Sequence, residues 1–76
     1  MENNWQNLIS INPDIRFGKP IITGTRICVS DILSWLSTGM SFEEIIEDFP
    51  ELKREDILAA LSFAANRENI TKIIAA

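Results

Sequence analysis

The most regular pattern of apolar and polar positions in the chain follows residue 41. Four apolar side chains recur there at intervals of three and four residues: Phe42, Ile45, Ile46 and Phe49. This spacing places them on one face of an α-helix. Ser41 and Glu44 match a capping box, which marks the start of a helix, and Pro50 marks its end. We therefore predict a short amphipathic helix at residues 42–49.

A second helix is predicted to begin near Arg54, after a tight link. Glu55 and Asp56 favour its first turn, because the amino end of a helix attracts anions. Its apolar stripe is predicted at five positions: Ile57, Leu58, Leu61, Ala64 and Ala65. Phe63 lies off this stripe, with Ala59 one turn before it. Such a second apolar face suits a partner protein, although a single exposed aromatic side chain is an equally plausible interpretation.

An earlier helix is predicted from Ser30, which is a favoured N-cap residue, with Asp31 in the first turn. Ile32, Leu33 and Leu36 supply its apolar side. Gly39 is expected to end it as the residue just past the helix.

The segment between Gly18 and Val29 predicts a small β-hairpin. Two β-prone runs flank Thr23-Gly24-Thr25, and Gly24 adopts a positive φ at little cost. Ile27 and Val29 then share one face, with Arg26 and Cys28 on the other. An irregular loop is the alternative. We expect Cys28 to be a small buried or partner-facing side chain.

The residues before the hairpin predict three short pieces. Residues 8–11 alternate weakly and predict a strand, and residues 12–14 (Asn-Pro-Asp) predict a turn. Residues 15–17 are expected to be extended and to end at Gly18.

Three isoleucines near the end of the chain recur at helical spacing: Ile70, Ile73 and Ile74. They predict an extension of the last helix, a fourth short helix, or a segment that packs on a second subunit. We assign them, with Phe63, to partner binding.

These elements predict one domain that is mainly α-helical with a small N-terminal β portion. Residues 9–29 form the β-hairpin region, residues 30–66 the helical bundle and residues 67–76 an apolar tail. The helix pair at 42–66 has the size of a helix-turn-helix. Compact helix pairs without DNA function are common, so this signal is weak by itself.

The composition limits the class of protein further. The chain has 76 residues, of which 46% are hydrophobic, so it is one small domain near the lower limit for a self-sufficient core. Small chains often borrow core from a partner, and we expect a homodimer. No apolar run approaches the length of a membrane span, and the first residues lack the features of a signal peptide. We expect a cytoplasmic protein without a membrane partner.

The residue types argue against an enzyme. The chain has one Cys, no His and no Tyr, so a disulfide within the chain, a zinc site and His-dependent nucleophilic pairs are not available. A group of acidic side chains follows residue 42: Glu43, Glu44, Glu47 and Asp48. Capping and solubility account for them, and we expect neither catalysis nor a metal or cofactor.

Charge is unevenly distributed around a net value of −4. Residues 31–52 carry six acidic side chains and no basic one, so any contact with phosphate must come from the two ends. We predict four DNA-binding side chains: Lys19, Arg26, Lys53 and Arg54. A protein-interaction module that does not bind DNA is the alternative.

An ordered series of short motifs adds to this picture. It comprises Ile9 to Pro13, Gly18-Lys19-Pro20, Gly24-Thr25-Arg26, Val29, Gly39-Met40-Ser41, Glu43-Glu44-Ile45, Phe49-Pro50-Glu51-Leu52 and Glu55-Asp56-Ile57. The series covers about residues 9–65 and resembles the domain of unknown function family 433. This is a bacterial and archaeal family of small proteins, some of them VapB-type antitoxins.

The resemblance implies a helix-turn-helix or winged-helix-like fold with an N-terminal β portion, usually as a dimer. It also implies an antitoxin that binds its operator DNA and restrains a PIN-domain ribonuclease toxin. Lys53 stands where family members often have Thr or Ser. We therefore expect the helix that follows Lys53 to lack its usual N-cap.

Overall fold

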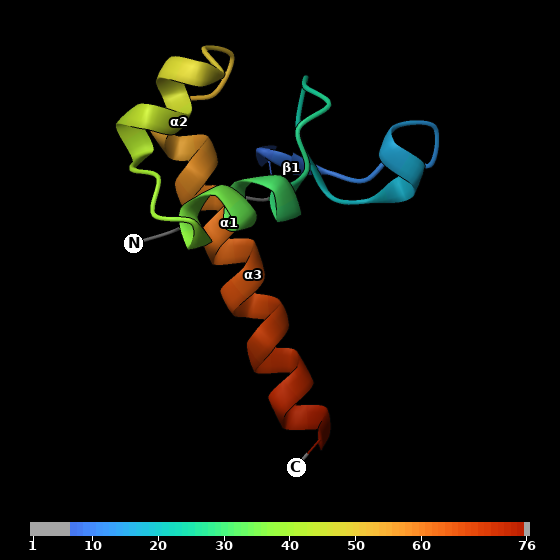
Figure 1. Ribbon diagram of the computed structural model, residues 1–76. Helices are drawn as coiled ribbons and strands as arrows, with labels where there is room; N and C mark the ends of the chain where they lie inside the picture. Colours follow the sequence, from blue (N-terminus) through green and yellow to red (C-terminus); the bar gives the residue numbers. More distant parts are fainter. Residues whose placement is uncertain (1–6, 76) are drawn as a thin grey trace.

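Three helices and a two-stranded sheet make up the computed structural model, which describes residues 7–75, with side chains to residue 66. The elements in chain order are β1 (Ile9–Ser10), the single-turn helix η2 (Arg16–Gly18), β2 (Ile21–Ile22), α1 (Val29–Ser37), α2 (Phe42–Asp48) and α3 (Arg54–Ala75). α3 is the long axis of the molecule, and the shorter elements gather around its amino-terminal half (Figure 1). The mainly α-helical fold with a small N-terminal β portion is confirmed.

The sheet joins two strands that the sequence analysis did not pair. β1 and β2 are antiparallel, with Ile9 opposite Ile22. The chain does reverse near Gly24, because the Ile22 N–H donates to the Ile27 carbonyl oxygen at 2.9 Å. However, the run at 26–29 forms only an isolated bridge between Ile21 and Cys28, since α1 already begins at Val29. The predicted reversal around Gly24 is therefore present as a single antiparallel bridge, and the full pairing of β2 is with β1.

The segment before β2 contains the predicted turn and a second turn that was not predicted. Asn12 accepts backbone bonds from Asp14 and Ile15, both at 2.9 Å, which confirms the turn at residues 12–14. Residues 15–17 were predicted to be extended, but only Ile15 is, with a φ of −121° and a ψ of 122°. Arg16 and Phe17 have φ values of +50° and +60° and form a left-handed turn.

All three α-helices begin with the same kind of hydrogen bond between a side chain and the backbone. A carboxylate in the first turn accepts the N–H of the residue before the helix, through Asp31 and Cys28 (3.0 Å), Glu44 and Ser41 (2.8 Å), and Asp56 and Lys53 (2.9 Å). The capping box at Ser41 is confirmed, because its hydroxyl also accepts the Glu44 N–H at 3.1 Å. The predicted N-cap at Ser30 was wrong, because α1 begins at Val29 with Cys28 as its N-cap and Ser30 lies inside the helix. Lys53 lacks an N-cap side chain, as expected, but the Asp56 carboxylate still accepts its backbone N–H.

Gly39 ends α1 as predicted. Its φ is +98°, and the next residue, Met40, donates its N–H to the Trp35 carbonyl oxygen at 3.3 Å while Gly39 donates to Leu36 at 3.0 Å. This pair of bonds is a Schellman motif, in which a left-handed residue satisfies carbonyl groups at the end of the helix.

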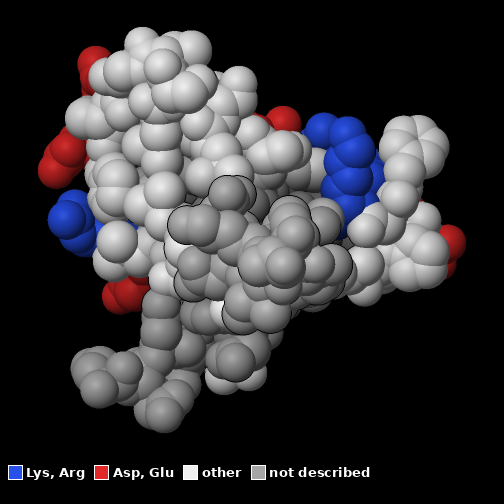
Figure 2. Space-filling view, turned by 90° about the horizontal axis from the view of Figure 1, so that it is seen from below, with Lys and Arg blue, Asp and Glu red and all other residues white. Residues whose placement is uncertain are grey.

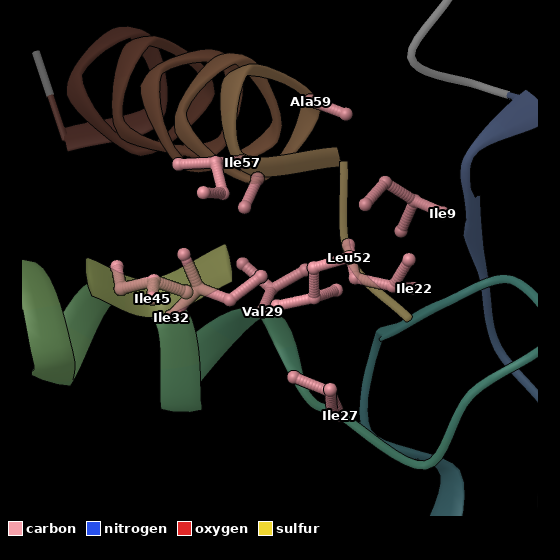
Figure 3. Close-up of a cluster of buried hydrophobic side chains, with 10 residues drawn as sticks. Ile9, Ile22, Ile27, Val29, Ile32, Ile45, Leu52, Ile57 and Ala59 are labelled. Carbon is pink, nitrogen blue, oxygen red and sulfur yellow. The ribbon is translucent and has the colours of Figure 1, made fainter. Parts of the chain in front are cut away.

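The core lies between the three helices and the inner face of the sheet (Figure 3). Ile57 of α3 faces Ile32 of α1 and Ile45 of α2 across this core, and all three are fully buried. Apolar side chains of the β portion complete it: Ile9, Ile22 and Ile27. Cys28 is also fully buried, as expected.

The apolar stripe predicted for α3 was partly wrong. The buried positions are Asp56, Ile57, Ala59 and Ala60, and Phe63 packs against the same core. Leu58 and Leu61 instead expose 43% and 38% of their surface. The sequence pattern gave more weight to leucine than to alanine. In the structure, Ala59 and Ala60 belong to the core that α3 shares with the other elements, and their methyl side chains leave room for close packing.

The backbone of α3 continues to Ala75, so the helical spacing near the end of the chain is an extension of this helix. The side chains of Ile70, Ile73 and Ile74 lie outside the described residues.

Candidate nucleic-acid interface

The amino end of α3 lies at the surface, where a short link joins it to α2. Leu52 anchors this link because its side chain is buried and its N–H donates to the Phe49 carbonyl oxygen at 2.9 Å. The residues that follow, Lys53, Arg54 and Glu55, are exposed. The predicted arrangement of a short helix, a tight link and a longer helix is therefore present.

Aromatic side chains fix this end of α3 and the position of α2. The Arg54 guanidinium carbon lies 4.8 Å from the centre of the Phe42 ring, within the range of a cation–π contact. At the other end of α2, Trp35 and Phe49 stack with their ring centres 4.3 Å apart and an angle of 10° between the rings. The contact with Phe42 holds the Arg54 side chain towards α2.

Acidic side chains lie close to Lys53, the residue just before α3. A hollow of about 440 Å³ borders Lys53 and is also lined by Glu51, Glu55 and Asp56. Exposed Glu43 adds a further negative charge on α2. The potential at the amino end of α3 is thus mixed, and only part of this surface favours phosphate.

Lys19 and Arg26, the other two predicted DNA-binding residues, are exposed and belong to the β portion. Arg26 lines a second open hollow of about 750 Å³, together with Glu51. Glu51 borders both hollows, so a negative charge lies between Arg26 and Lys53. The Lys and Arg side chains of this face form two separate groups (Figure 2). Arg26 and Lys53 therefore border different hollows.

Arg16 is a structural residue that the prediction of this site left out. Its guanidinium Nη1 donates to the Arg26 carbonyl oxygen at 2.8 Å and to the Asp31 carboxylate at 3.2 Å. These contacts join residues that are 10 and 15 positions apart in the chain, so no local sequence pattern predicts them. Arg16 orders the loop that carries Arg26 and fastens it to the start of α1.

The predicted partner-binding residues are only partly described. Phe63 is half-buried and packs against the core, so part of its ring is used within the chain. The exposed Leu58 and Leu61 were not assigned to a partner, because the sequence pattern placed them in the core.

The fold and this surface define a small three-helix domain with an N-terminal two-stranded sheet and two basic groups. Within the described residues, no helix combines the length and the apolar character needed to cross a membrane. Residues 9–64 match the family described as "Protein of unknown function (DUF433)", and the chain belongs to this family.

Two relatives illustrate the similarity. A crystal structure of a DUF433 member protein from Anabaena variabilis has a TM-score of 0.75 and 33% sequence identity, covering 93% of this chain and 71% of that chain. "Uncharacterized protein y4eO" from Sinorhizobium fredii is 34% identical over 59 residues, which is 78% of this chain. The chain spans only 27% of the length of that relative.

Proposed function

We propose that this protein is a dimeric DNA-binding regulator that acts as the antitoxin of a type II toxin–antitoxin pair. The observation that carries the proposal is the helix pair α2–α3, with Lys53 and Arg54 exposed at the amino end of α3. In a helix-turn-helix, this end of the second helix meets the base edges. Lys19 and Arg26 add phosphate contacts, and a homodimer doubles this sparse set of cations.

Binding of the full chain to the duplex upstream of its own gene tests the proposal. Fluorescence anisotropy over a salt series is expected to show an affinity that falls steeply with salt, because phosphate contacts release counterions. Arg54→Ala is expected to weaken binding, and Arg54→Lys to retain more of it because the charge remains. Unfolding curves of both variants separate this effect from loss of the contact with Phe42. An unchanged affinity for Arg54→Ala contradicts the assignment of α3 as the recognition helix.

The toxin part of the proposal concerns a PIN-domain ribonuclease and the carboxy-terminal half of α3. Phe63, Ile70, Ile73 and Ile74 are the residues proposed to contact this toxin or a second copy of the chain. We expect a neighbouring gene to encode a PIN-domain protein. Expression of that protein is expected to arrest cell growth, and co-expression of this chain is expected to relieve the arrest. Co-expression that leaves the arrest unchanged contradicts the antitoxin role.

A protein-interaction module without DNA binding is the second candidate function, and the exposed Leu58 and Leu61 favour it. Absence of DNA binding at low salt, with an intact dimer by light scattering, favours this module over the regulator.

A further inference from the structure

The turn η2 holds three consecutive residues in a left-handed backbone conformation. Arg16, Phe17 and Gly18 have φ values of +50°, +60° and +79°, and two of them carry a Cβ. This conformation is unfavourable for such residues. Backbone strain persists only where the surrounding structure imposes it, and it is concentrated at functional sites.

The Arg16 side chain anchors the turn. Its two hydrogen bonds connect the turn to the Arg26 carbonyl oxygen and to Asp31. The same Asp31 oxygen accepts the Cys28 N–H at 3.0 Å, at the start of α1. The turn is therefore fastened to the helical part of the protein at its base.

The residue at the tip of this fastened turn is an exposed phenylalanine. Phe17 exposes 95% of its surface, whereas Phe42, Phe49 and Phe63 are half-buried and pack against the core. Exposure of a phenyl ring in water forgoes the stabilisation that burial supplies. Neither folding energy nor backbone preference accounts for a phenylalanine at this position.

The charge around Phe17 is opposite in sign to that of residues 28–66. We name residues 11–26 the basic lobe, which has three basic side chains and one acidic one, a net charge of +2. The helical body, residues 28–66, has eight acidic and two basic side chains, a net charge of −6. The lobe extends to the side of the molecule opposite α2 (Figure 1). The lobe therefore attracts a polyanion more strongly than the body, whose basic side chains are Lys53 and Arg54 alone.

We propose that Phe17 contacts nucleobases, with its ring against the face of a base while Lys19 and Arg26 bind the adjoining phosphates. Exposed aromatic side chains flanked by cations bind nucleic acids in this way, either by stacking on single strands or by entering a base step of a duplex. The inference rests on the proposed DNA-binding function and names a second element that enters the DNA.

Binding of the full chain to labelled duplex and single-stranded oligonucleotides from the upstream region tests the inference. Phe17→Ala is expected to reduce affinity by about 5- to 150-fold, the range measured for loss of one base stack. Phe17→Trp is expected to retain binding. Ile11→Ala is the matched control, because Ile11 is an exposed apolar residue of the same lobe, and it is expected to change affinity by less than about twofold.

Two further measurements separate a contact role from a structural one. The fluorescence of 2-aminopurine in the oligonucleotide is expected to change when the wild-type chain binds and to stay unchanged with Phe17→Leu. Asn tolerates a left-handed backbone, so Phe17→Asn is expected to raise the melting temperature while it weakens binding. The duplex and single-strand series show which form presents the base.

Each outcome bears on a different proposal. Wild-type binding with equal affinity for Phe17→Ala overturns this inference and leaves the proposed function standing. If the wild-type chain binds neither the duplex nor the single strand, the proposed function is overturned, and this inference with it. A lower melting temperature for Phe17→Asn also overturns the inference, because Phe17 then supports the fold.

Discussion

The helical body and the basic lobe differ in how well their backbone conformations agree with local residue preferences. In the body, each helix begins with a carboxylate that accepts the N–H of the preceding residue, and α1 ends at a glycine that suits its positive φ. In the lobe, Arg16 and Phe17 occupy a conformation that their residue types disfavour. Proteins tend to break local rules where they function, and this contrast directs attention to the lobe.

The two regions are joined at Asp31. Its Oδ2 accepts a bond from the Cys28 backbone at the start of α1 and another from Arg16 in the lobe. Both carboxylate and guanidinium are about one-third exposed, so solvent screens the ion pair. The shared atom nevertheless makes the geometry of the lobe depend on the start of α1.

The largest effect is expected inside the body. Ile57→Ala removes a fully buried side chain that faces α1 and α2 and is expected to lower the free energy of unfolding by about 2–5 kcal/mol. Leu58→Ala is its control one position along α3, where the side chain is 43% exposed, with an expected loss of under about 1 kcal/mol. Urea denaturation followed by circular dichroism measures both. Equal losses would show that the buried face of α3 is assigned wrongly.

An intermediate effect is expected at the junction of the two regions. Asp31→Ala removes the bond to Cys28 and the anchor of Arg16 together, with an expected loss of about 1–3 kcal/mol. Glu44→Ala removes only the equivalent backbone bond of α2, so its expected loss is about 0.5–1 kcal/mol. Hydrogen exchange at residues 16–19 is expected to accelerate in Asp31→Ala alone. The coupling of lobe and body is contradicted if both variants leave that exchange unchanged.

The smallest effect compares one glycine from each region. Gly39 in the body and Gly24 in the lobe have φ values of +98° and +85°, and an added Cβ meets no atom within 4 Å at either position. Alanine at each position is expected to cost about 1 kcal/mol, from backbone strain alone. Thermal unfolding of the two variants measures the costs. A much smaller cost for Gly24→Ala would indicate that the lobe relaxes more readily than the body.

Most helix boundaries were predictable because they depend on neighbours within four residues. Ser41, Glu44 and Pro50 bound α2, and Gly39 ends α1, through bonds that local sequence specifies. The predicted start of α1 was two residues too late. Cys28 is not a recognised N-cap residue, and the bond that Asp31 accepts there comes from a backbone N–H, which every residue except proline has. The exposed cations of the candidate site were predicted from the sequence, but the position of Glu51 between Arg26 and Lys53 was not predicted.

The sequence by itself determined three helices, the turn at residues 12–14 and the uneven charge, since each depends on residues close together in the chain. The tertiary structure decided the pairing of β1 with β2, the burial of Ala59 and Ala60 in place of Leu58 and Leu61, and the left-handed turn at Phe17. These features depend on contacts between distant residues, such as Arg16 with Asp31. No local preference encodes such a contact, and here it outweighs the preference of Arg16 and Phe17 for a right-handed or extended backbone.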